Sequence, residues 1–216
     1  MIPISDESPK GYIPFVNYGL IIINIVAFIY QPGSSEALSA FFNTYGLVPS
    51  KLTENPGNPM VYLNIFSSMF LHADLMHLAG NLLYLWIFGD NIEYLIGHAR
   101  YLIFYLIVGI AAAMAQIAGF PGTDVPMVGA SGAISGVLGA YLLKFPRNRV
   151  SLLFFFFFII RVIHVPALIV LSFWFIFQIY NGILFSGEAG VAWYAHIGGF
   201  VAGFLVIKLF EHYPKY

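Results

Sequence analysis

Long runs without a charged side chain are the feature that most limits how this chain folds. Such runs cover residues 13–30, 101–119, 125–143, 165–187 and 189–207. A helix that crosses a bilayer needs about 20 consecutive, mostly apolar residues. Only 9% of the 216 residues are charged, whereas an average soluble domain has roughly 25%. The chain is therefore predicted to be an integral membrane protein rather than a soluble or disordered one.

A sixth span is predicted over residues 74–96, where Asp74 is suited to be the N-cap of the helix. The stretch 31–60 between the first two spans is polar and rich in proline and glycine, so it is predicted to be a loop. These assignments predict an all-α membrane protein with six transmembrane helices.

The segment 150–160 does not fit this pattern. It holds five consecutive phenylalanines, Phe154–Phe158, but it is too short to cross a bilayer before Arg161. A membrane-surface segment, a re-entrant piece and an extended start to the next helix are all compatible with it, and lipid-facing bulk is the plainest interpretation. Pro166 is expected to mark where the following span begins.

The distribution of charge indicates orientation and excludes some functions. A net charge of -1 offers no basic surface for nucleic acid, and the absence of cysteine excludes disulfides and thiol chemistry. With six spans and both termini in the cytoplasm, Lys51 is the only one of nine basic residues on the outer face. Residues 1–12 and 211–216 are then cytoplasmic tails of a membrane domain over 13–210. The first ten residues do not resemble a cleaved signal peptide.

Polar residues inside the spans are candidates for function because burying them in a membrane is costly. His77 and Asn81 lie four residues apart, so they share one face of the helix over 74–96. The alternative is that they only form hydrogen bonds between packed helices.

Ser131 lies in the run Gly129-Ala130-Ser131-Gly132, with glycine on either side of the serine motif. Such a serine can be exposed at a sharp backbone turn. Small residues at this spacing are equally typical of close helix packing. A helix that begins at Ser131 and ends near Leu143 spans about 20 Å, less than the ~30 Å of the hydrocarbon core. It would begin inside the membrane, facing a cavity.

His196 lies near the outer end of the last span, beside a second stripe of small residues at Gly199 and Gly203. A buried histidine with a satisfied partner is the alternative. Because His77, Ser131 and His196 lie at similar depth, they can share one cavity as oxyanion donor, nucleophile and general base. No acidic residue is available to orient His196, which favours a dyad over a triad.

Together these motifs resemble the rhomboid intramembrane serine proteases of the prokaryotic six-helix form. The resemblance covers the serine motif, the His196 motif, the pattern of His72, His77 and Asn81, and the stretch Gly89-Asp-Asn-Ile-Glu93-Tyr-Leu-Ile-Gly97. Glu93 is interpreted as structural, bonding loop backbone groups.

The resemblance implies roles for particular residues. Ser131 is the nucleophile and His196 the base, and His77, Asn81 and the Ser131 backbone amide form the oxyanion hole. His72 and Gly129 are candidates for supporting the site. For His72 two roles stay open, one related to the site, such as holding water, and one as a solvated or capping residue at the outer boundary.

The resemblance also implies the biology of the protein. The helix over 165–187 is a substrate gate around Trp174 and Phe177. Transmembrane proteins in the lipid bilayer of the cell membrane are the substrates, neither metal nor cofactor is needed, and the site opens on the extracytoplasmic side. One departure is Ser135, where some members have an aromatic residue packed on the histidine. Another is the absence of Trp and Arg from 31–60.

Two other functions are compatible with a polar cavity in a membrane protein. A non-catalytic rhomboid-like binder of membrane helices would usually lack the nucleophile or the base, and both are present here. A small transporter is less consistent with the sequence, which shows no charged residue in mid-span and no inverted repeat.

Overall fold

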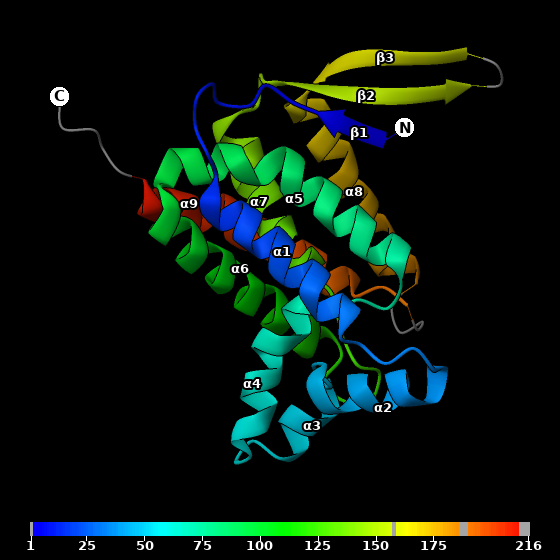
Figure 1. Ribbon diagram of the computed structural model, residues 1–216. Helices are drawn as coiled ribbons and strands as arrows, with labels where there is room; N and C mark the ends of the chain where they lie inside the picture. Colours follow the sequence, from blue (N-terminus) through cyan, green and yellow to red (C-terminus); the bar gives the residue numbers. More distant parts are fainter. Residues whose placement is uncertain (1, 157–158, 186–189, 212–216) are drawn as a thin grey trace.

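The computed structural model describes residues 2–156, 159–185 and 190–211, and shows a helical bundle with a three-stranded sheet beside it (Figure 1). The helices of the bundle are α1 (Phe15–Ile29), α5 (Leu75–Ile96), α6 (His98–Gly119), α7 (Ser131–Lys144), α8 (Ala167–Leu184) and α9 (Trp193–Phe210). In the described part of the chain, α6, α8 and α9 are long and apolar enough to cross a membrane, and α1 is a shorter apolar helix.

Helix α7 lies inside the bundle, and it packs against α9 through backbone rather than through side chains. A Cβ atom on Gly203 of α9 would overlap the carbonyl oxygen of Gly136 in α7, and one on Gly199 would overlap that of Gly132. The close approach buries the middle of α7 almost completely, as Val137 and Tyr141 show. This contact therefore fixes the start of α7 relative to the start of α9.

Glu93, near the end of α5, holds the start of α1. One carboxylate oxygen accepts from Val16 N (3.0 Å) and His98 Nδ1 (2.5 Å), and the other accepts from Asn17 N (2.6 Å). The residue before α1 is Pro14, which provides no side-chain cap. A buried carboxylate in this position satisfies the free amides of a helix start. The structural interpretation of Glu93 is confirmed.

The region predicted as a loop between the first two spans is largely helical. It contains α2 (Ser35–Tyr45), α3 (Pro49–Glu54) and the first two residues of α4 (Pro59–Ser67). Helix α4 and the 3-10 turn η1 (Ser68–Phe70) that follows it continue beyond the predicted loop. The backbones of Leu47 and Met127 pair in both directions, at 3.1 and 2.7 Å. These helices therefore pack near the segment that leads into α7 (Figure 1). Asp74 caps α5 as predicted, since its carboxylate accepts from His77 N at 2.8 Å.

The prediction of an all-α fold is wrong in one part. Strands β1 (Ile2–Ser5), β2 (Arg149–Phe156) and β3 (Ile159–Pro166) form an antiparallel sheet in the order β1-β2-β3. The run of β-branched and aromatic residues favours strands, and a hairpin satisfies the backbone of a segment too short to span. Residues 157–158 of the phenylalanine run lie outside the described residues. Helix α8 begins directly after Pro166, as predicted.

The sheet also includes part of the segment expected to be an N-terminal tail, because β1 pairs with β2. Asp6 attaches this strand to the bundle: its carboxylate accepts from the Tyr141 hydroxyl (2.5 Å) and from Asn91 Nδ2 (2.8 Å). Burial raises the pKa of Asp6 from 3.8 to about 6. Most of the expected C-terminal tail, 212–216, lies outside the described residues.

The attachment of β1 is predicted to depend on pH. Because the pKa of Asp6 is raised by folding, its contribution to stability is complete below pH 3.8 and is lost as the pH rises through about 6. Asp6→Asn keeps an oxygen that can accept from Tyr141 but removes the titration. Thermal unfolding in detergent should show the midpoint of the natural protein falling relative to that of Asp6→Asn as the pH rises from 3.8 to about 6, with no further relative change above that. A constant difference across this range would contradict the assignment.

The contact between α7 and α9 predicts that Gly203→Ala destabilises the protein by about 1–3 kcal/mol, the range for overpacking a filled interior. Gly19→Ala in α1 is the matched control, since a Cβ there meets no atom within 4 Å. That control should be neutral or stabilising by up to about 1 kcal/mol, from helix propensity alone. Equal unfolding free energies for the two variants would show that the α7–α9 contact is not tight.

Candidate active site

Ser131 is the first residue of α7, at the point where an extended segment turns into the helix. Gly129, two residues earlier, has φ +128°, a backbone conformation that favours glycine. A Cβ atom on Gly129 would lie only 2.7 Å from Nε2 of His77. Two separate features therefore favour glycine at position 129: the positive φ of the turn and the closeness of the His77 ring.

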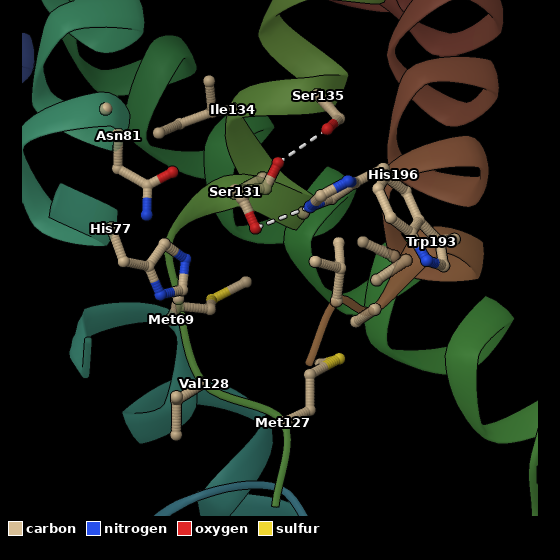
Figure 2. Close-up of a pocket in the computed structure, with 18 of the residues that line it drawn as sticks. Met69, His77, Asn81, Met127, Val128, Ser131, Ile134, Ser135, Trp193 and His196 are labelled. Carbon is tan, nitrogen blue, oxygen red and sulfur yellow. Dashed lines mark hydrogen bonds between the residues drawn. The ribbon is translucent and has the colours of Figure 1, made fainter. Parts of the chain in front are cut away.

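The hydroxyl of Ser131 and the imidazole of His196 are directly hydrogen-bonded. Ser131 Oγ lies 2.8 Å from His196 Nε2 (Figure 2). His196 lies in the first turn of α9, at the end of the helix where the sequence placed it. The structure thus brings together two residues that are 65 positions apart in the sequence.

Gln178 of α8, which the sequence analysis did not single out, holds the other side of the imidazole. Its Oε1 lies 2.8 Å from His196 Nδ1, and the side chain is 4% exposed. An amide oxygen only accepts, so Nδ1 carries the proton and Nε2 is left to accept from Ser131. The signal that could have found Gln178 is its polarity within an otherwise apolar span.

Tryptophan rings, rather than a residue on α7, pack around His196. The centroids of Trp174 and Trp193 each lie 6.1 Å from the imidazole centroid. Ser135, which occupies the position where an aromatic residue was expected, instead donates to the backbone carbonyl of Ser131 at 2.6 Å (Figure 2). The departure at Ser135 is therefore accompanied by aromatic packing from α8 and from the start of α9.

His77 and Asn81 face Ser131 from α5, as Figure 2 shows. Asn81 Nδ2 is buried and has no acceptor among the described residues. The first backbone amides of α7 are further donors, because the N–H groups of an initial helical turn have no acceptor within their helix. Several donors are therefore available beside the Ser131 hydroxyl.

These groups line a cavity of about 550 Å³. Trp174 and Phe177 of α8 form part of its wall, together with Trp193. His72 is not among the residues that line it. Its ring packs edge-on against His77, with centroids 5.2 Å apart, and its two ring nitrogens have no partner in the described part of the chain. Burial lowers the pKa of His72 to about 4, so its ring is neutral at pH 7.

The Rhomboid domain family model matches residues 59–212, which include all of α5 to α9. The chain belongs to the rhomboid family. Its relatives include the rhomboid protease GluP of Bacillus subtilis, 36% identical over 65% of this chain and 24% of that protein. The human mitochondrial presenilin-associated rhomboid-like protein is 29% identical over 63% of this chain and 34% of its own length.

A plant relative, RHOMBOID-like protein 1 of Arabidopsis thaliana, is 31% identical over 70% of this chain and 35% of that protein. The matched regions thus span only about a quarter to a third of the length of these relatives. The family assignment identifies the chain as a multi-pass membrane protein of the rhomboid protease family.

Gln178 predicts a change in the reactivity of this rhomboid. Gln178→Leu should slow labelling of Ser131 by a fluorophosphonate about tenfold or more, because an unpaired Nδ1–H costs ~1–3 kcal/mol. Gln178→Glu should label much faster than Gln178→Leu. Its carboxylate favours protonated His196, so the loss of labelling on acidification should occur at a higher pH than in the natural protein.

Asn181→Ala is the control for the Gln178 variants. Asn181 lies on the same helix, is buried to a similar extent, and donates to the carbonyl of Phe177 in its own helix rather than to His196. If Asn181→Ala slows labelling as much as Gln178→Leu, the effect comes from α8 packing and not from orientation of His196.

Proposed function

We propose that this rhomboid is an intramembrane serine endopeptidase that cleaves transmembrane segments of other membrane proteins. The observation that carries the proposal is the hydrogen bond between Ser131 and His196, with Gln178 favouring the tautomer in which Nε2 accepts. The protease named among its relatives supports the same reaction class.

In the proposed reaction, Ser131 Oγ attacks the carbonyl carbon of a peptide bond while His196 Nε2 takes the hydroxyl proton. The carbonyl oxygen gains negative charge and accepts hydrogen bonds from Asn81 Nδ2, His77 and the Ser131 amide. The C–N bond then breaks, and His196 returns the proton to the leaving amine. A water molecule, deprotonated by His196, hydrolyses the resulting ester and releases Ser131.

Orientation of the base in this reaction does not need a carboxylate. The amide oxygen of Gln178 takes the place that a buried aspartate has in a triad, and it stabilises the imidazolium less strongly because it is neutral. A neutral orienting group costs less to bury in a membrane than a charged one. His72 supports the site from behind, by packing against His77.

We further propose that α1, α5 and α7 cross the membrane together with α6, α8 and α9, which gives six spans over the domain 13–210. The 14 residues of α7 rise about 21 Å, so Ser131 begins a short central helix below the outer surface. In this arrangement the protein lies in the inner membrane of the cell, with both termini and most basic residues in the cytoplasm. Water reaches the cavity from the extracytoplasmic side.

Helix α8 is the proposed gate through which a substrate helix enters. Its outward residues are apolar and exposed, and Trp174 and Phe177 line the cavity, although Phe177 is also 49% exposed. A substrate segment that unwinds easily would present its peptide bond beside Ser131 without a metal or cofactor.

The proposal predicts that Ser131→Ala abolishes cleavage of reconstituted transmembrane substrates and leaves thermal unfolding unchanged, because only the nucleophilic oxygen is removed. Ser135→Ala is the matched control, one turn further along α7, and should retain activity. The measurement is gel analysis of proteoliposomes, and comparison of membranes carrying either form would identify natural substrates by mass spectrometry.

The same variants separate this proposal from its alternatives. A non-catalytic binder would capture membrane helices without cutting them and without covalent labelling of Ser131. A transporter would show uptake that survives Ser131→Ala. Undiminished cleavage by Ser131→Ala would exclude the dyad.

A further inference from the structure

The β2–β3 hairpin carries an apolar face that no described helix covers. In the register of the pair, Leu153 lies opposite Val162 and Phe155 opposite Ile160, so these four side chains share one face. Ile2 of β1 lies beside Leu153 on the same face. We call the set Ile2, Leu153, Phe155, Ile160 and Val162 the sheet patch.

Most of the sheet patch is exposed, whereas the opposite face of the sheet is covered along β2 but not along β3, where Ile163 is 37% exposed. Phe155 is 54% exposed, Ile160 65% and Val162 48%, but Val150 and Leu152 on the other face are 0% and 7% exposed. In Figure 1 the hairpin projects beyond the helices, past the start of α8. An apolar surface of this kind on a sheet indicates contact with something other than water.

The connection to α8 indicates what the contact is. Strand β3 ends at Pro166 and α8 begins at the next residue, so the base of the hairpin lies where a membrane-spanning helix starts. On α8 the exposed side chains Leu168, Ile169 and Phe173 continue the apolar surface, at 51%, 59% and 72% exposure. The strand that carries half of the sheet patch thus leads directly into a helix whose exposed side chains are apolar, with the polar pair Ser151 and His164 between them.

The sheet cannot lie deep in the hydrocarbon core. Among the described strands, β3 pairs only with β2, so its outer edge presents N–H and C=O groups that need water. Polar groups at the base agree with this depth, since Ser151 Oγ and His164 Nδ1 pair at 3.1 Å. The boundary between headgroups and acyl chains accommodates both an apolar face and a hydrated edge.

We propose that the sheet patch binds the bilayer surface at the end of the bundle where α8 starts, and anchors the hairpin in the headgroup–acyl boundary. The partner is lipid, not a second protein, because the surface is apolar and its strand leads into α8, a helix long and apolar enough to cross a membrane. By the orientation proposed above, the leaflet is the cytoplasmic one. The proposal does not depend on protease activity.

Because the chain has no cysteine, a single introduced cysteine can be labelled without competition from other thiols. Phe155→Cys and Val162→Cys each place a single thiol in the sheet patch for an environment-sensitive fluorophore. Phe173→Cys on α8 is the control for deep lipid contact, and Glu7→Cys, exposed near β1, is the control for water. Thermal unfolding first selects variants that keep the fold, and the two patch positions provide independent probes.

Labelled proteins are reconstituted into vesicles of phosphatidylcholine and phosphatidylglycerol that carry a nitroxide either near the headgroup or near the end of the acyl chain. The patch labels should emit at shorter wavelength than the label at position 7, and the shallow nitroxide should quench them more than the deep one. The label at position 173 should show the opposite preference.

Other outcomes would overturn the proposal. Quenching of the patch labels by aqueous iodide but not by lipid nitroxides would show that the patch faces water. Blue-shifted emission that neither lipid nitroxide quenches would show that protein covers the patch. Energy transfer between separately labelled copies would then identify that protein as a second copy of this chain.

Discussion

The close contact between α7 and α9 is the interaction on which the rest of the structure depends. Gly203 and Gly199 of one helix lie against the carbonyl oxygens of Gly136 and Gly132 of the other, with no side chain between them. Inside a bilayer the hydrophobic effect does not bring helices together, so close van der Waals packing of small residues has to hold them together. The same contact places the first turn of α7 beside the first turn of α9, and so brings Ser131 to His196 at 2.8 Å.

The candidate site is shared among helices that reach it from different sides. Helix α7 contributes Ser131, α9 contributes His196, and α5 contributes His77 and Asn81. Helix α8 contributes Gln178, which bonds to the imidazole, and many of its other side chains are apolar and exposed. Orientation of His196 therefore depends on the position of α8, so a displacement of that helix would disturb the hydrogen bond between Ser131 and His196.

The opposite end of the bundle is held by polar contacts rather than by close backbone packing. Glu93 caps α1, and Asp6 attaches the first strand of the sheet to Tyr141 and Asn91. Buried carboxylates are tolerated there because amides, a hydroxyl and an imidazole surround them. The site end contains no comparable carboxylate among the residues that contact His196 in the described structure, which agrees with the orienting role of a neutral amide.

Residue patterns along the chain were enough to predict a membrane protein, the approximate positions of its apolar helices and the candidate residues Ser131, His196, His77 and Asn81. These follow from local rules: the length of an apolar run, four-residue spacing and the cost of polar groups in lipid. The pairing of β2 with β3, and of β2 with the N-terminal strand β1, emerged from the three-dimensional structure alone, because the contact of β1 with β2 joins segments about 150 positions apart. The structure alone also assigned Gln178 to His196 and Trp174 to the packing around the ring. Those contacts arise from the relative rotation of α8 and α9, which no spacing within either helix specifies.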